Sequence, residues 1–255
     1  MIAQEREDWI CIVSDDGSND DGRAVIDEAT AGDPRFFHVR NTRNLGFYGN
    51  FEAALARVPP DVEFVALSDR DDRWYPYKLE ALANALVDGA SLAYSDMRIV
   101  DDGGRVISAS YWGYRRNSWT SLPLMLVANT VTGAACMMRR SLVDLLLPFP
   151  PRVGDAFHDH WIACAALATG RIEYVDRPLY DYVQHGGSII GHCGFEKPRR
   201  ASGAARNPLR YLNPVNAKSL AARFTGSAPG GILARVSAHR IDLPQPARAR
   251  RYRRR

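Results

Sequence analysis

Short apolar runs alternate with helical segments along much of the chain, and this alternation most constrains the fold. The run Trp9–Val13 is followed by a turn at 15–18 and by a helical segment over Asp21–Ala31. Two more apolar runs follow, Phe36–Val39 and Val62–Leu67. Strands that alternate with helices favour a mainly parallel sheet with helices on both faces. We therefore predict an α/β domain built on a Rossmann-like, mostly parallel sheet.

The alternation of predicted strands and helices continues to about residue 194 and is absent from the rest of the sequence. We expect further helices at Phe47–Val58, from Pro76 to about Val87, at Ser118–Val127, from Ser141 and at Asp159–Thr169, strands at Leu92–Tyr94, Thr132–Met138, Ile172–Val175 and Leu179–Gln184, and a hairpin within Arg98–Val106. Beyond Gly194 the periodicity fades, and Pro, Arg, Ala and Gly accumulate. We predict one domain over 1–194 and a largely disordered basic tail over 195–255.

The charge is divided between these two parts. Residues 196–255 carry a net charge of +13, whereas residues 1–195 carry −9, which together give the overall +4. We favour a solvated extension for the tail. Peripheral contact with anionic lipid headgroups is the next alternative, because each basic residue near such a surface contributes about 1 kcal/mol. Nucleic-acid binding is disfavoured, since the tail has few aromatic residues and no recognisable nucleic-acid motif.

Composition excludes several classes of protein. An apolar fraction of 46% and a charged fraction of 24% are typical of a globular domain. No apolar run approaches the roughly 20 residues that span a bilayer, and the first eight residues contain no apolar core typical of an export signal. Four cysteines lie far apart without CxxC spacing: Cys11, Cys136, Cys164 and Cys193. We expect reduced thiols in a cytoplasmic protein.

Acidic residues follow two of the predicted strands. Asp69, Asp71 and Asp72 come after the third strand, and Asp15 and Asp16 come after the first. Ligands of parallel sheets gather at the carboxyl ends of the strands, and a divalent cation would relieve the repulsion between such carboxylates. The alternatives are a solvated acidic turn for the first group and a turn with a helix cap for the second.

A third cluster, His158-Asp159-His160-Trp161, opens a predicted helix. Asp159 there can serve as a general base, and the alternative is a carboxylate that only caps the helix. The histidines, with His185, His192 and Cys193, could suggest zinc, but no spacing here matches a zinc signature.

Six motifs in order resemble the bacterial family 2 glycosyltransferases. They are Asp15–Ser18 (D-D-G-S), Arg43–Gly46 with Asn50 and Ala53–Ala54 beyond, Ser68–Trp74 (S-D-x-D-D-x-W) with Pro76 and Lys78–Leu79, Thr132–Gly133 with Met137–Met138, His158–Trp161, and Tyr182–His185. Each motif is weak alone, and the ordered set over about residues 1–191 is specific. The S-D-x-D-D-x-W form is most similar to rhamnosyltransferase-like members.

The resemblance implies a GT-A fold and an inverting transfer of sugar from a nucleoside-diphosphate sugar to a saccharide or lipid-linked acceptor. It implies a role in surface polysaccharide biosynthesis, in the cytoplasm or peripherally at the inner face of the membrane. The roles it implies are nucleotide-sugar binding for Asp15, Asp16, Arg43, Asn44 and Asp69, binding of Mg²⁺ or Mn²⁺ for Asp71 and His185, proton removal for Asp159, and acceptor contact for Thr132, Gly133 and Trp161.

The sequence departs from the family pattern in two places. Met1–Gln4 resembles the end of the family's first helix, so the resemblance predicts that about 30–40 residues, including a central strand, are absent and that two strand edges are exposed. Val183 stands where the family has an arginine. A non-catalytic relative that binds nucleotide sugar or a partner is therefore an alternative. A nucleotidyltransferase is another, although the Gly-rich loop it usually carries is not seen.

Overall fold

The computed structural model describes residues 1–18, 20–87, 89–113, 115–152 and 157–184. Strands and helices alternate along them as follows: β1 (Cys11–Asp15), α1 (Asp20–Thr30), β2 (Phe36–Arg40), α2 (Gly46–Leu55), β3 (Phe64–Ala66), β4 (Arg73–Trp74), α3 (Lys78–Ala85), β5 (Ala90–Asp101), β6 (Val106–Ser108), α4 (Leu122–Val127), the 3₁₀ turn η1 (Gly133–Ala135), β7 (Cys136–Arg139), α5 (Arg140–Leu146), α6 (His158–Thr169) and β8 (Arg171–Gln184). The predicted α/β class is confirmed, and the proposed tail lies outside the described residues.

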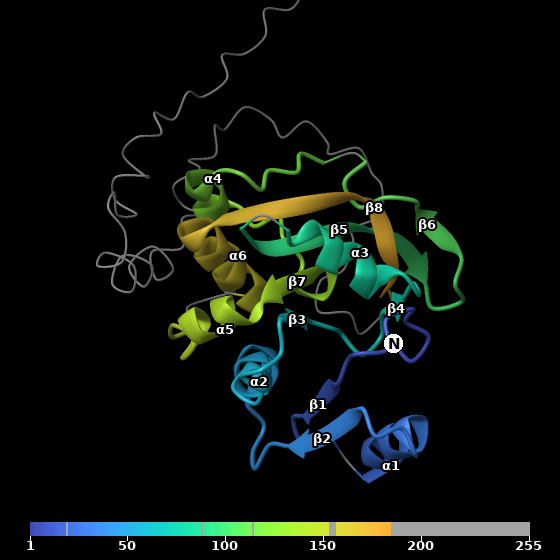
Figure 1. Ribbon diagram of the computed structural model, residues 1–255. Helices are drawn as coiled ribbons and strands as arrows, with labels where there is room; N and C mark the ends of the chain where they lie inside the picture. The colour runs from blue at the N-terminus through green and yellow to red at the C-terminus, as the bar shows by residue number, and fades with distance from the viewer. Residues whose placement is uncertain (19, 88, 114, 153–156, 185–255) are drawn as a thin grey trace, which may run out of the picture.

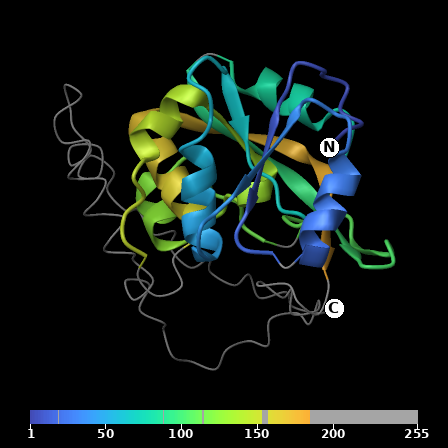
Figure 2. The same cartoon turned by 90° about the horizontal axis from the view of Figure 1, so that it is seen from below.

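The strands form two separate sheets. β1 and β2 pair in parallel as a two-stranded sheet, while the larger sheet has the order β3-β7-β5-β8-β4, with β6 paired to β5. Figure 1 shows the small sheet and α1 set apart from the larger sheet, and Figure 2 shows them from below. Among the described residues of the larger sheet, β5 and β8 pair in parallel and the other pairs are antiparallel, so the direct pairings are mixed.

The longest pairing joins β5 to β8 and runs through the middle of the larger sheet. Two strands were predicted over the last segment, but β8 is one strand of 14 residues. The register shifts between Ser95 and Asp96, where Asp96 lies opposite Pro178. An irregularity in the pairing therefore accommodates Pro178 inside one continuous strand, where the sequence had predicted two strands.

Helices cover both faces of the larger sheet. Leu92 and Tyr94 of β5 pack into a cluster with α4, α5 and α6, whereas Ala90 and Ala93 pack with α3 on the opposite face. Leu92, Ala93 and Tyr94 follow the two-residue period of a strand, whereas Ala90 departs from it because the register shifts between Ala90 and Leu92. No helix in the described segments is long and apolar enough to cross a bilayer. Three of the four cysteines, Cys11, Cys136 and Cys164, are free thiols as expected; the fourth lies outside the described residues.

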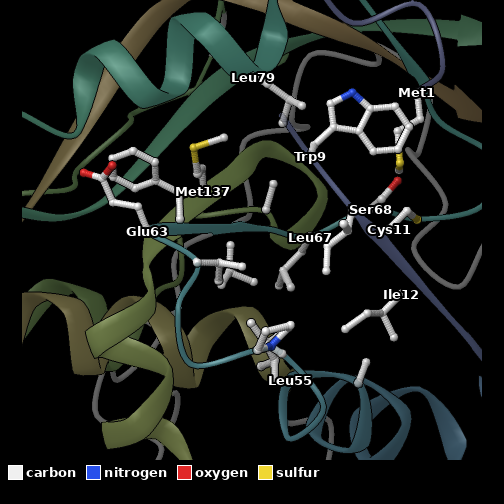
Figure 3. Close-up of a pocket in the computed structure, with 18 of the residues that line it drawn as sticks. Met1, Trp9, Cys11, Ile12, Leu55, Glu63, Leu67, Ser68, Leu79 and Met137 are labelled. Atoms are coloured by element: carbon white, nitrogen blue, oxygen red, sulfur yellow. The ribbon is translucent and has the colours of Figure 1, made fainter. Parts of the chain in front are cut away.

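A cavity of about 500 Å³, lined by both polar and apolar residues, lies between the two sheets. Figure 3 shows Ile12 of β1, Leu55 of α2 and Leu67 after β3 around it, and Met1 and Trp9 also line it. In the described segments, β1 pairs only with β2, and β3 pairs only with β7. One edge of each strand thus lacks a partner among the described residues.

Helix α5 offers a matched pair of substitutions that tests this packing. Leu146 is 0% exposed in the cluster with α6, whereas its neighbour Leu145 is 42% exposed. We expect Leu146→Ala to lower the free energy of unfolding by about 2–5 kcal/mol, because it leaves a cavity in the core. Leu145→Ala should change it by less than about 0.5 kcal/mol. Urea unfolding measures both, and equal effects would contradict the packing described for α5.

Candidate active site

Asp15 builds the turn that follows β1. Its Oδ1 accepts hydrogen bonds from the backbone N–H groups of Ser18 at 2.7 Å and Gly17 at 3.2 Å. These bonds lower the pKa of the Asp15 carboxyl, with a smaller contribution from Arg40 at 3.7 Å. Gly17 has φ +97°, a conformation that side-chain-bearing residues rarely adopt. The turn holds the next residue, Asp16, at the end of the strand.

Asp16 joins this turn to the loop that precedes α2. Its Oδ1 accepts hydrogen bonds from Asn41 Nδ2 at 3.0 Å and from Leu45 N–H at 2.8 Å, while its backbone oxygen accepts one from Asn44 Nδ2 at 2.9 Å. Arg43 is exposed in the same loop. The structure therefore brings together four of the residues predicted to bind the nucleotide: Asp15, Asp16, Arg43 and Asn44.

Two amides in this region had no predicted role. Asn50 Oδ1 accepts hydrogen bonds from Ser14 Oγ at 2.7 Å and Asn41 Nδ2 at 2.9 Å, and Asn50 Nδ2 donates to Ser14 O at 3.1 Å. Asn50 thereby fixes α2 to β1. Asn41 follows Arg40, which pairs with Asp15 across the two strands. A correct β1–β2 register would have placed Asn41 beside Asp16, but register is not visible in the sequence.

The acidic loop, defined here as Asp69–Asp72, connects β3 to β4. Burial raises the pKa of Asp69, and the charge of Asp71 raises it further. Burial and the charge of Asp69 raise the pKa of Asp72 to about 8. Both carboxylate oxygens of Asp72 are buried, and neither has a hydrogen-bond partner of good geometry among the described residues. The loop therefore concentrates negative charge where water cannot stabilise it.

Lys78 supplies a buried positive charge beside this loop. It is 0% exposed, and its Nζ lies 3.9 Å from the centre of the Trp74 ring and 4.1 Å from that of Tyr180. Burial lowers its pKa to about 7, although the charge of Asp72 opposes the shift. Lys78 belongs to the third sequence motif, but no role could be predicted for it, because fully buried lysines are rare and depend on tertiary partners.

Asp159 lies in the first turn of α6, with both oxygens of its partly buried carboxyl hydrogen-bonded. Oδ1 accepts from Asn129 Nδ2 at 3.0 Å, and Oδ2 accepts from the Gly133 N–H at 3.2 Å. Burial nevertheless raises the pKa of the carboxyl to about 7, and the charge of Asp69 contributes to the rise. A carboxyl with this pKa is suited to proton transfer near neutral pH. Asn129 was missed by the sequence analysis.

His158 packs behind Asp159. Its ring stacks on Phe51 of α2 at 3.8 Å between centroids, and neither ring nitrogen has a hydrogen-bond partner among the described residues. Burial lowers its pKa to about 3, so the ring is neutral. A Cβ on Gly133 would lie 2.7 Å from His158 Nε2, which explains why a glycine fits this close contact.

One acceptor-side prediction is wrong. Trp161 is 0% exposed in the core, and its Nε1 donates a hydrogen bond to Leu146 O at 3.2 Å. Two positions after Asp159 on a helix, a side chain points to a different face. Gly133 contacts Asp159 through its backbone, and Thr132 is half-buried beside it. The acceptor contacts of Thr132 and Gly133 stay predictions.

Of the two predicted metal ligands, the structure describes Asp71 and not His185. His185 lies outside the described residues, and within them no three His, Cys, Asp or Glu side chains surround a single point. The acidic loop still fits Mg²⁺ or Mn²⁺ in two respects: its donors are carboxylate oxygens, and the buried Asp72 oxygens have no hydrogen-bond partner of good geometry among the described residues. Mg²⁺ commonly uses one or two carboxylates and takes its other ligands from water and phosphate.

Helix α2 connects the two halves of the site. Its Asn50 faces the Asp16 side, while Phe47 stacks on Phe157 and Phe51 stacks on His158. On the other side, the charge of Asp69 acts on Asp159, which places the acidic loop near the base. The cavity between the sheets is a different space, because Asp15, Asp16, Asp69 and Asp71 are not among its lining residues.

The family of the chain follows from its match to a family model. The model for glycosyl transferase family 2 matches residues 1–147, which is more than half of the chain. The chain belongs to glycosyltransferase family 2. An uncharacterized glycosyltransferase of Nostoc sp. is 25% identical over 193 residues, which cover 73% of this chain and 59% of the relative. The chain thus spans about three fifths of that relative's length.

Solved structures show the same fold. Residues 1–349 of S. aureus TarS, in complex with UDP-GlcNAc, superpose with a TM-score of 0.56 at 18% identity, covering 73% of this chain and 53% of that one. A second structure of S. aureus TarS superposes with a TM-score of 0.54 at 17% identity, covering 71% of this chain and 32% of that one. The predicted GT-A fold of this family 2 chain is therefore confirmed.

The raised pKa of Asp159 predicts a pH-dependent loss of stability. The folded state holds this proton to about pH 7, whereas the ordinary value is 3.8. Between these values the folded state binds more protons, so the free energy of unfolding falls as the pH rises. Asp159→Asn removes this loss. Between pH 5 and pH 8 we expect its stability relative to wild type to increase by about 1–3 kcal/mol.

Urea unfolding at several pH values measures this difference. Asp102→Asn in the exposed β5–β6 turn is the control, and its stability relative to wild type should not change in the same way. If the difference in free energy of unfolding between Asp159→Asn and the wild type does not vary with pH, the pKa of Asp159 is not raised in the folded state.

Proposed function

We propose that this family 2 glycosyltransferase transfers a sugar from a nucleoside-diphosphate sugar to a hydroxyl group with inversion, and that Asp159 is the general base. The observation that carries the proposal is the environment of Asp159: a partly buried carboxyl with a pKa near 7, held by Asn129 and Gly133 and close enough to the acidic loop to sense the charge of Asp69.

A general base is needed because a sugar hydroxyl is a very weak acid. Asp159 accepts the proton of this hydroxyl as its oxygen attacks the anomeric carbon, and the bond to the leaving diphosphate breaks. Proton transfer of this kind contributes about 10²–10⁴-fold to rate. One base without an enzyme nucleophile supports a single displacement, which inverts the anomeric centre. The two hydrogen bonds to Asp159 orient its carboxylate for this attack.

We assign the nucleotide part of the donor to the turn after β1 and the loop before α2. Asp16 is held there by Asn41 and Leu45, and the exposed Arg43 lies in the same loop. Asp15 acts by shaping the turn, and Asp69 lies on the sugar-diphosphate side. The UDP-GlcNAc complex of TarS supports a nucleotide-sugar donor, because that donor binds a chain of the same fold.

We assign a divalent cation, Mg²⁺ or Mn²⁺, to the acidic loop, with Asp71 as a ligand and His185 as a further candidate. When bound, it would supply positive charge that stabilises the leaving diphosphate. Asp69 and Asp72 lie in the same loop, and burial and mutual repulsion raise the pKa of both, so a bound cation would favour their ionised forms. The S-D-x-D-D-x-W form of this loop supports a rhamnosyltransferase-like subtype.

The acceptor we propose is a saccharide or lipid-linked saccharide of a surface polysaccharide, with Thr132 and Gly133 on its side of the site. Their place beside Asp159 supports this assignment. A cytoplasmic location suits a nucleotide-sugar donor, and the +13 tail supports peripheral contact with an anionic membrane face.

The separated sheets favour a second candidate, a relative that binds nucleotide sugar without turnover. The cavity between β1 and β3 leaves the nucleotide side attached to the rest through α2 and loops. Incubation with a panel of nucleotide sugars and Mn²⁺ separates the two candidates. Release of nucleoside diphosphate supports an enzyme, whereas saturable binding without release supports the binding protein.

Substitution of Asp159 tests the catalytic proposal directly. We expect Asp159→Asn to reduce kcat by about 10²–10⁴-fold and to leave the donor Kd unchanged, because the base meets the acceptor rather than the donor. In the wild type, kcat should fall below about pH 7 as Asp159 takes up a proton. Calorimetry and a coupled diphosphate assay measure these values. Wild-type turnover in the variant would contradict the role of Asp159.

Removal of the cation tests the role of the acidic loop. We expect a chelator to abolish transfer and added Mn²⁺ to restore it, and Asp71→Asn to weaken Mn²⁺ binding at least tenfold, because a carboxylate ligand is lost. Titration calorimetry measures the affinity. Asp144→Asn, in an exposed ion pair on α5, is the control and should bind Mn²⁺ as the wild type does. Transfer that persists in excess chelator would contradict this assignment.

A further inference from the structure

Lys78 occupies a position that is costly for a lysine. It is the first residue of α3, where the helix dipole disfavours a positive charge, and it is 0% exposed. An ammonium group loses its hydration there, so its burial must be compensated by neighbouring groups. The proposed function assigns Lys78 no task. Its partners indicate what the buried charge does.

These partners come from both sides of the active site. From the donor side, the Trp74 ring packs against the ammonium group, and the charges of Asp72 and Asp69 favour its protonated form. From the other side, Ala134 O accepts a hydrogen bond from Lys78 Nζ at 2.6 Å. The side chain therefore spans from the acidic loop to the turn η1.

The turn η1 is also the element that contacts the base. Ala134 lies at its centre, and the preceding residue, Gly133, donates its N–H to Asp159 Oδ2 at 3.2 Å. A movement of this three-residue turn would change the Gly133–Asp159 bond. The hydrogen bond from Lys78 to Ala134 O restrains the turn next to the residue that contacts Asp159.

We propose that Lys78 is a positioning residue that links the acidic loop to the catalytic base. By holding Ala134, it keeps the Gly133 N–H directed at Asp159, and so stabilises the charged form of that carboxyl. This inference rests on the proposed role of Asp159. It adds a connection between donor side and base that the motifs do not reveal.

Several other titratable groups lie near Asp159 and bear on its pKa. Asp69, from the loop after β3, disfavours its ionised form. The Cys136 thiol of β7 lies close enough for its own pKa to respond to Asp159. On α6 itself, burial lowers the pKa of the neighbours His158 and His160, which favours their neutral forms. Lys78 reaches this turn through its hydrogen bond to Ala134 O.

The test compares the wild type with Lys78→Met, which keeps the length of the side chain and removes its charge and donors. We expect the Asp159 pKa to rise by about one unit, a tenfold change in proton affinity, because a bond to the carboxylate is weakened. Carbon-13 NMR of labelled aspartate measures this pKa, with the resonance assigned by its absence in Asp159→Asn. The acid limb of kcat should shift equally, with the donor KM unchanged.

Leu82→Ala is the matched control for a loss of stability alone. Leu82 is 0% exposed on the same helix and packs in the cluster with α3 on the opposite side of the sheet from α6. It should lower the unfolding temperature without moving the Asp159 pKa. An unchanged Asp159 pKa in Lys78→Met, or an equal rise in Leu82→Ala, would overturn the proposal.

A second pair of variants covers the case in which Lys78→Met does not fold. Lys78→Met combined with Asp72→Asn removes both members of the buried charge pair, which is better tolerated than leaving one. Compared with Asp72→Asn alone, it should show the same rise in the Asp159 pKa, and an unchanged value would overturn the proposal. The NMR measurement needs no turnover. Full activity of Asp159→Asn would therefore refute the proposed function while the titration still decides the role of Lys78.

Discussion

Buried charge around one ammonium group organises the centre of this molecule. Asp69 and Asp72 lie on one side of Lys78, and the turn that carries Gly133 lies on the other. In a partly dry interior, each carboxylate disfavours the ionisation of the others. The pKa of Asp159 is raised mainly by burial, and the charge of Asp69 adds to the rise. The divalent cation proposed for the acidic loop would favour the ionised forms of these carboxylates.

Helix α2 couples that centre to the nucleotide side. Through Asn50 it is bonded to Ser14 and Asn41, and through Phe51 it stacks on His158 next to the base. The small sheet and the large sheet have no strand pairing between them in the described segments, and a cavity lies there instead. Helix α2 and the N-terminal segment, in which Gln4 hydrogen-bonds to Tyr75 O and to the Leu79 N–H, therefore connect the two parts of the molecule.

Much of the candidate site could be predicted because its residues are close in sequence. The turn at 15–18, the loop at 43–46 and the acidic loop each follow a strand, and local spacing was enough to identify them. Residues that act through distant contacts were missed. Asn129 meets Asp159 across 30 positions, and Lys78 meets Ala134 across 56. The error at Trp161 has a related cause, since a motif places a residue in order but does not decide which face of the helix is buried.

The sequence by itself determined the α/β class, the order of the elements and the family 2 motifs, because hydrophobic periodicity and turn residues act over a few positions. Only the tertiary structure decided the strand pairing, including the antiparallel β3–β7 and β5–β7 contacts and the continuous β8. It also decided which charges share one buried space. Pairing and burial depend on residues that are far apart in the chain, and no local pattern specifies their distance.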